Sequence, residues 1–333
     1  MLGLLRAFDD SGRYALYNNA PFSLFAHYIY AHYLCPLLMS TMINDCHDTH
    51  SAPAIRAYLG GSFDPVHRGH VQMAMAVYHC LLPIAKQQQR DLHVSLLPNA
   101  RSPFKTHSTD PAHRLAMLTL ATQDTPLQIS ELELWQTPPV YTIDSVHALR
   151  QRYPNDCLIF IMGMDSARSL DKWKDGLKLT DSVHLWVFGR HSINGSINGS
   201  INGSINGLAD TAALQAELPT ALQNRIIDTP SKLLLPISQT LTNSHAVKKA
   251  YKGHIYIDNH PIIAISSTEL RQQLQSTTRR ANTAPKAETH TTSVTSINAI
   301  IGHTTPNPFA KWLNPAVYHY IMTHQLYSAA QFR

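Results

Sequence analysis

Short apolar runs alternate along the chain with longer stretches in which apolar residues recur at helical spacing. The apolar runs predict strands at 55–59, 92–97, 127–130, 157–162 and 183–188. Helices are predicted from 71, from 110, over 142–152, from 266, and from 314 toward 327. Strands separated by helices favour right-handed β-α-β units. We therefore predict an α/β fold, a Rossmann-like doubly wound parallel sheet with helices on both faces and a small C-terminal helical part.

Three of these helices have recognisable starts. Asp110-Pro111 and Asn314-Pro315 each place a capping side chain before a proline at the first helical position. Ser266 is followed three residues later by Glu269, the pattern of a capping box. These signals fix where the segments begin more firmly than the apolar pattern does.

Three segments do not fit the alternating pattern. Residues 192–207 repeat Ser-Ile-Asn-Gly four times, and 276–308 are rich in Thr, Ser, Ala and Asn; both predict flexible insertions. Residues 1–53 predict an extension outside the fold, disordered or included by a wrong start choice. Residues 14–44 carry no Asp, Glu, Lys or Arg, but histidines and a proline interrupt the run of about twenty apolar residues that a membrane span needs. A membrane tether remains an alternative there, and one folded domain is predicted over 54–333.

Composition excludes few classes of binding partner. The net charge of +5 and the pI near 9.0 suit anionic small substrates as well as nucleic acid, and no basic run is present, so we expect no nucleic-acid partner. Four cysteines are scattered without a Cys-x-x-Cys pair. This favours a cytoplasmic protein without disulfides or a protein-built metal site.

The segment that follows the first predicted strand carries the clearest chemistry. It reads Gly60-Gly61-Ser62-Phe63-Asp64-Pro65-Val66-His67-Arg68-Gly69-His70. Glycines allow the backbone to approach a ligand, and the helix that follows offers N–H groups and a positive dipole end. His67 and His70 would direct two imidazoles at the same anion. The segment therefore predicts a nucleotide phosphate site, and it resembles the G-x-F-D-P-x-H-x-G-H signature of the nucleotidyltransferase superfamily.

A second anion-binding element is predicted near the C-terminus. Ile265-Ser266-Ser267-Thr268-Glu269-Leu270-Arg271 is a helix start bearing hydroxyls, with an arginine one turn on. Alone it fits an ordinary capped surface helix. Together with the first motif it favours binding of phosphate oxygens opposite the two histidines.

With both motifs, the chain resembles the bacterial nicotinate-nucleotide adenylyltransferases from about Ile55 to Tyr327, apart from the two insertions. The resemblance implies transfer of the adenylyl group of ATP to nicotinate mononucleotide, giving deamido-NAD and pyrophosphate, in cytoplasmic NAD biosynthesis. It implies Mg²⁺ bound through the ATP phosphates and no metal site on the protein. ATP and nicotinate mononucleotide are the expected partners of a monomer or small homo-oligomer.

The motifs and the resemblance together assign roles to individual residues. The catalytic groups are His67, His70 and Arg271. The ATP-binding residues are Gly60, Gly61, Ser62, Phe63, His67, His70, Asp165, Ser267, Thr268 and Arg271. The mononucleotide-binding residues are Ser62, Lys105, Tyr141, Thr142 and Trp173. In the family the turn at Tyr141-Thr142 receives the nicotinate carboxylate, and the tryptophan stacks on the pyridine ring.

Several positions depart from the family pattern or allow another interpretation. Ser102, Phe104, Gln136 and Val140 stand where the family usually has Pro, His, Arg and Ser. Trp173 could instead be a core tryptophan and Lys105 a solvated loop lysine, whereas Asp144 is expected to stabilise its own helix. An adenylyltransferase that prefers nicotinamide mononucleotide, or a nucleotide sensor without turnover, are the alternative functions.

Overall fold

The protein is described from a computed structural model. It describes residues 52–101, 108–189, 211–234, 251–263, 265–283 and 310–327. Residues 1–51, the Ser-Ile-Asn-Gly repeat, Lys105, and the part of the second predicted insertion after residue 283 lie outside these ranges.

Seven parallel strands form one sheet in the described part of the chain, in the order β3-β2-β1-β4-β5-β7-β6. The strands are β1 (Ile55–Gly61), β2 (Leu92–Pro98), β3 (Gln128–Ile129), β4 (Cys157–Gly163), β5 (His184–Phe188), β6 (Ile226–Ile227) and β7 (Ile255–Asp258). The order reverses between β1 and β4. Ligands of doubly wound sheets bind beyond the carboxyl ends of the strands at such a switch point. The predicted fold class is confirmed.

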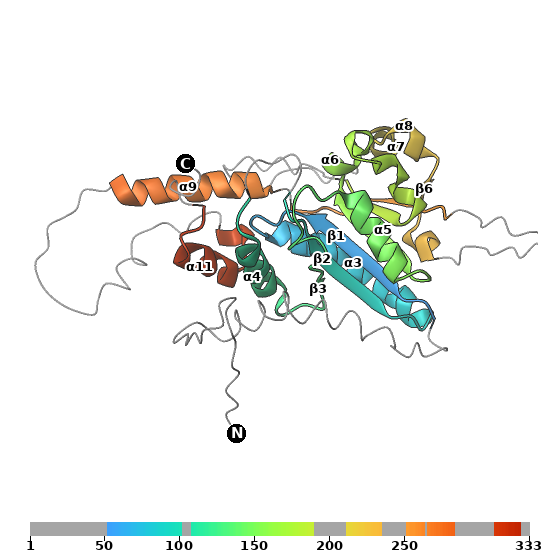
Figure 1. The fold of residues 1–333 in the computed structure, drawn as a ribbon, viewed down its shortest axis with the longest axis horizontal. Coiled ribbons are helices and arrows are strands. Elements are labelled where there is room, and N and C mark those ends of the chain that lie inside the picture. Colours follow the sequence, from blue (N-terminus) through green and yellow to red (C-terminus); the bar gives the residue numbers. More distant parts are fainter. Residues whose placement is uncertain are drawn as a thin grey trace, which may run out of the picture. The chain divides into compact units, whose positions relative to one another are not determined.

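Helices cover both faces of this sheet (Figure 1). They are α3 (Arg68–Gln87), α4 (Pro111–Thr122), α5 (Thr142–Arg152), α6 (Met164–Ala167), α7 (Thr211–Ala216), α8 (Thr220–Gln223), α9 (Ser267–Thr283) and α11 (Pro315–Thr323). Short 3₁₀ turns lie at η3 (Leu170–Lys172), η4 (Gly176–Asp181), η5 (Pro230–Leu234) and η6 (Ala310–Trp312).

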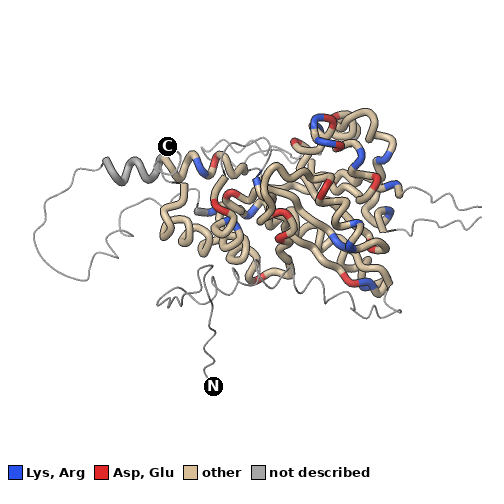
Figure 2. The backbone as a smooth tube through the Cα atoms, in the orientation of Figure 1, with Lys and Arg blue, Asp and Glu red and all other residues tan. Residues whose placement is uncertain are grey.

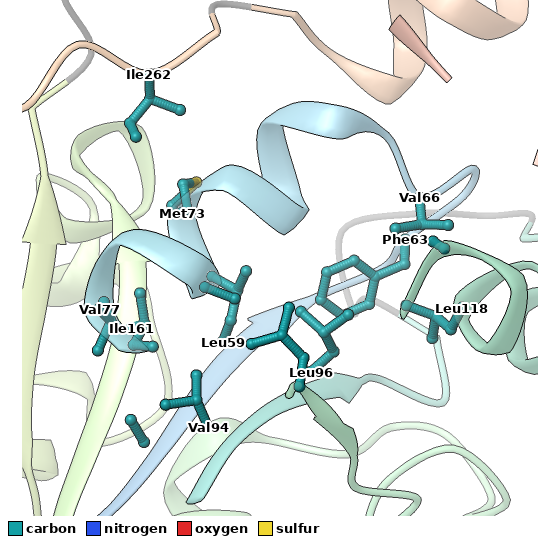
Figure 3. Close-up of a cluster of buried hydrophobic side chains, with 14 of the residues drawn as sticks. Leu59, Phe63, Val66, Met73, Val77, Val94, Leu96, Leu118, Ile161 and Ile262 are labelled. Atoms are coloured by element: carbon teal, nitrogen blue, oxygen red, sulfur yellow. The ribbon is translucent and has the colours of Figure 1, made fainter. Parts of the chain in front are cut away.

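The apolar side chains of the strands belong to two separate cores, one on each face of the sheet. Ile159 and Ile161 of β4 join one core with α3, α4, α9 and α11. Leu158, Phe160 and Met162 join the other core with α5, η3 and η4. Side chains alternate between faces along a strand, so a continuous apolar run fills both cores at once. Figure 3 shows the first core beneath α3.

The structure moves several predicted boundaries. Helix α3 begins at Arg68 and not at 71, because His67 is the extended N-cap and Gly69 is accommodated in the first turn. The strand predicted at 127–130 is reduced to the two residues of β3, which pair only with β2. Helix α9 continues to Thr283, so the first eight residues of the segment predicted as an insertion from 276 are helical. The last helix ends at Thr323, before residues 326 and 327.

The predicted helix starts are confirmed by their hydrogen bonds. The Asp110 carboxylate accepts from the N–H of Ala112, and the Asn314 side chain from that of Ala316, at 2.8 and 2.9 Å. Ser266 Oγ accepts from the N–H of Glu269, and the N–H of Ser266 donates to the Glu269 carboxylate, both at 3.1 Å.

Charges of both signs are interspersed along the described elements (Figure 2). Among the described residues, no helix is long and apolar enough to cross a membrane.

Candidate active site

The site lies at the carboxyl ends of β1 and β4, where the strand order reverses. A pocket of about 460 Å³ opens there. Seven residues predicted from the sequence line it: Gly60, Gly61, Ser62, Tyr141, Thr142, Asp165 and Trp173. The loop between β1 and α3, residues 62–67, leads from this pocket to the two histidines.

That loop is anchored in the core by its own apolar side chains. Phe63 and Val66 are buried among Leu59, Leu96 and Leu118 (Figure 3). Phe63 has a φ of 47°, a left-handed conformation that costs an ordinary residue about 1–2 kcal/mol. Burying its ring offsets that cost.

Gly60 serves the packing of the protein itself. A Cβ at this position would meet the ring of Phe160. The sequence interpretation assigned the glycine pair to close approach by a ligand. In the structure the missing side chain of Gly60 also leaves room for the ring of Phe160, and both residues line the pocket.

His67 and His70 form a stacked pair at the start of α3. Their ring centroids are 3.6 Å apart with the planes inclined by 21°. The N–H of His67 donates to Nδ1 of His70 at 3.3 Å. Because that nitrogen accepts, the ring proton of His70 is on Nε2, which makes Nε2 a hydrogen-bond donor. His67 is buried, and the edge of Phe63 packs on His70 at 4.9 Å.

The start of α9 lies against the same loop. Ser267 Oγ donates to the carbonyl of Pro65 at 2.9 Å, and Arg271 donates to the carbonyl of Asp64 at 2.5 Å. Arg271 also donates to Thr268 Oγ1 at 3.1 Å. The hydroxyl proton of Ser267 is thus already used within the protein, whereas Thr268 accepts and keeps its own proton. Ser267 acts as a tether, and Thr268 with Arg271 keeps donors for a ligand.

Gln72 holds the segment that leads into α9. Its amide nitrogen donates to the carbonyl of Pro261 at 3.3 Å, and its amide oxygen accepts from the N–H of Ile263 at 2.9 Å. A Cβ on Gly69 would meet the carbonyl oxygen of Ile263 at 2.9 Å, so glycine is needed for this approach. The first turns of α3 therefore carry His70 and also hold the segment that leads to Arg271 in α9.

A fully buried arginine supports the loop from below. Arg114 of α4 donates to the backbone carbonyls of Ser62, Asn99, Ala100 and Thr109 at 2.7–3.1 Å. Burial lowers its pKa, but arginine starts so high that it stays charged.

The buried Asp64 completes this support. Its carboxylate accepts from the N–H of Thr109 at 3.2 Å and from the hydroxyl of Tyr327 at 2.7 Å. The residues just after α11 are thereby tied to the loop that carries His67.

The opposite wall of the pocket combines the start of α5 with the loop carrying Trp173. Tyr141 is the N-cap of α5 and makes no side-chain hydrogen bond to the first turn, so N–H groups there are available to a ligand. Lys174 lies 4.5 Å from the centre of the Tyr141 ring and pairs with Asp144 at 3.1 Å. These contacts hold the half-buried Trp173 beside the helix start.

Glu133 is a buried carboxyl in the lining of the same pocket. Burial raises its pKa to about 7, and the Ser145 hydroxyl, which favours the ionised form, opposes this only in part. Desolvation penalises a carboxylate whose environment offers few donors.

Comparison with known proteins agrees with this geometry. Residues 58–273 match the model of the cytidylyltransferase-like family. A probable nicotinate-nucleotide adenylyltransferase of Pseudoalteromonas atlantica is 31% identical over 277 residues, which cover 83% of this chain and 95% of the relative. The chain belongs to the nicotinate-nucleotide adenylyltransferase family.

Two further similarities were found. The nicotinate-nucleotide adenylyltransferase of Bacillus subtilis is 41% identical over 132 residues, covering 39% of this chain and 64% of the relative. A structure of Plasmodium falciparum nicotinic acid mononucleotide adenylyltransferase complexed with NaAD is 17% identical, covers 82% of this chain and 97% of its own, and gives a TM-score of 0.47.

Sequence reasoning missed three supporting residues in this family member. Arg114 could have been found, because it occupies the apolar face that α4 builds with Met117, Leu118 and Ala121 at helical spacing. Gln72 gave no such signal, since its hydrogen-bond partners lie in a distant segment. Glu133 begins a segment that resembles a family motif, but the sequence assigned it no role and did not show its burial.

Proposed function

We propose that the protein transfers the adenylyl group of ATP to nicotinate mononucleotide, releasing deamido-NAD and pyrophosphate. One arrangement carries this proposal: the His67–His70 pair and the start of α9 meet on one loop, directly beside a pocket lined by Trp173 and the open start of α5. The histidine pair and the start of α9 suit a triphosphate. The pocket at Trp173 and the start of α5 suits an anionic ring.

In this reaction a 5′-phosphate oxygen of the mononucleotide attacks the α-phosphorus of ATP, the new P–O bond forms, and the bond to pyrophosphate breaks. No covalent enzyme intermediate is needed, so the protein positions the reactants and stabilises charge. His70, with its proton on Nε2, would donate to an oxygen of the α-phosphate as negative charge develops. His67 stacks on that ring and fixes its orientation.

On the ATP side, Arg271 and Thr268 would bind the β- and γ-phosphates, while Ser267 secures α9 to the loop. Asp165, in the first turn of α6 after β4, lines the pocket and would accept from a ribose hydroxyl. The backbone of Gly60–Phe63 would lie between the two substrates.

On the mononucleotide side, the ring would stack on Trp173 while its carboxylate accepts from N–H groups at Tyr141–Thr142. Ser62 and Lys105 would contact the 5′-phosphate; Lys105 lies outside the described residues.

We propose that Mg²⁺ enters bound to ATP and that the protein works in the cytoplasm as a monomer or small homo-oligomer. Among the described residues no three His, Cys, Asp or Glu side chains gather as metal ligands. The cation would then be held mainly by phosphate oxygens and water. When bound, Mg²⁺ neutralises charge on the triphosphate.

The test is pyrophosphate release by the full chain with Mg²⁺-ATP and either nicotinate or nicotinamide mononucleotide. We expect faster release with the nicotinate substrate, because helix N–H groups favour an anion over a neutral amide. Preference for the amide would support the nicotinamide alternative. Absence of release with both would overturn the proposal and favour a sensor.

Trp173→Ala is expected to raise KM for nicotinate mononucleotide by about tenfold or more, since stacking on an aromatic face contributes about 1–3 kcal/mol. The KM for ATP should change much less. Trp135→Ala is the matched control, because Trp135 is exposed and does not line the pocket. A Trp173 variant with unchanged KM would assign this side chain to packing alone.

A further inference from the structure

Glu133 presents a chemical conflict inside the proposed mononucleotide pocket. Its side chain is only 5% exposed, yet it lines the cavity together with Ser62, Tyr141 and Trp173. A substrate ring that carries a carboxylate would enter the same cavity. Two ionised carboxyl groups in one cavity repel each other, which favours proton uptake by one of them.

The substrate carboxylate is not the group that takes up the proton. A carboxyl on a pyridinium ring is strongly acidic because the ring nitrogen carries a positive charge. Glu133, in contrast, becomes neutral close to neutral pH, because burial raises its pKa to about 7. A neutral carboxylic acid has an O–H donor that an ionised one lacks.

We infer that Glu133, as a neutral acid, donates a hydrogen bond to the ring carboxylate of the mononucleotide and thereby selects it over the carboxamide. This inference rests on the proposed function and adds a side-chain determinant to the helix N–H groups of α5. The ionised form of Glu133 repels the carboxylate and accepts from the amide nitrogen of the competing substrate. Discrimination between the two substrates is therefore set by one proton.

Other charges around the pocket do not replace this role. Asp165 of α6 and Lys172 and Lys174 of the Trp173 loop also line the cavity. Asp144 lies on α5 next to Ser145 but is exposed and pairs with Lys174. Glu131, two residues before Glu133, is exposed and accepts from Trp135 Nε1 at 2.6 Å. Among the carboxyl groups of described residues that line the pocket, Glu133 is the buried one. Burial therefore affects the protonation of Glu133.

The first experiment measures kcat/KM for both mononucleotides by pyrophosphate release between about pH 6 and pH 8.5. We expect the nicotinate-to-nicotinamide ratio to fall by about tenfold or more across this range in the unmodified protein, because the neutral acid is titrated away. Glu133→Gln keeps a neutral donor at every pH, so its ratio should stay flat. Glu131→Gln is the matched control and should follow the unmodified protein.

A second measurement uses the unmodified protein and does not depend on the variant folding. Calorimetric titration at pH 7 in buffers of different ionisation enthalpy counts the protons taken up with each mononucleotide. Their 5′-phosphates are identical, so the difference between the two ligands reports the ring substituent. We expect more protons taken up with nicotinate mononucleotide than with the amide.

The outcomes separate this inference from the proposed function. Release with nicotinate mononucleotide at a substrate ratio independent of pH, or equal proton uptake with both ligands, would overturn the role of Glu133 and leave the reaction intact. The same pH dependence in Glu133→Gln as in the unmodified protein would also overturn it. No release with either mononucleotide at any pH would instead contradict the proposed function.

Discussion

Replacing either histidine of the stacked pair is expected to lower kcat by about 10²–10³-fold, because removing one preorganised donor to a developing negative charge costs about 2.7–4 kcal/mol. His70→Ala removes the Nε2–H donor directly. His67→Ala removes the ring that lies 3.6 Å from it and fixes its plane. The measurement is single-turnover formation of deamido-NAD at saturating substrates, which separates chemistry from release.

The structural cost of these substitutions should be modest. Helix α3 extends over 20 residues and is fixed by Met73, Val77 and Leu81 in the core, so its packing does not depend on the imidazoles. His79→Ala, an exposed histidine of the same helix, is the control and should keep full activity. If the His67 and His70 variants turn over as fast as His79→Ala, the pair has no role in catalysis.

Replacing Arg114 is expected to have the largest effect on stability. Arg114→Met would leave four backbone carbonyls without their donor, and each buried unsatisfied group costs about 1–3 kcal/mol. We expect the free energy of unfolding to drop by about 4 kcal/mol or more, measured by urea denaturation. Such a loss is a large part of the stability of an ordinary domain.

Arg114→Lys separates charge from geometry. Lysine keeps the positive charge but presents a single ammonium, which cannot reach all four carbonyls that the guanidinium bonds. We expect it to lose most of the same stability, together with activity, since the carbonyls belong to the loops at the pocket. Arg152→Met, an exposed arginine of α5, should change stability by less than about 1 kcal/mol. A fully stable Arg114→Lys would show that charge alone matters.

Much of the fold was determined by local sequence. Continuous apolar runs identified the buried strands β1, β2, β4 and β5, because a strand covered on both faces has no polar side to show. Capping residues such as Asp110 and Asn314 identified helix starts, because they satisfy N–H groups only two residues away. The two phosphate motifs could be recognised for the same reason: each is a strand-to-helix or helix-start signal within about ten residues.

Only the tertiary structure decided what surrounds those motifs. Gln72 bonds the N–H of Ile263 across 191 positions, Ser267 bonds Pro65 across 202, and Arg271 bonds Asp64 across 207. No local pattern encodes such pairs, since they depend on where the chain returns. The same holds for Gly60 beneath Phe160, and for Glu133, whose protonation depends on burial by distant segments. The sequence determined most of the elements and predicted the reacting groups. The folded chain decided their support, their hydrogen-bonding roles and their charge, because these depend on neighbours that meet only in space.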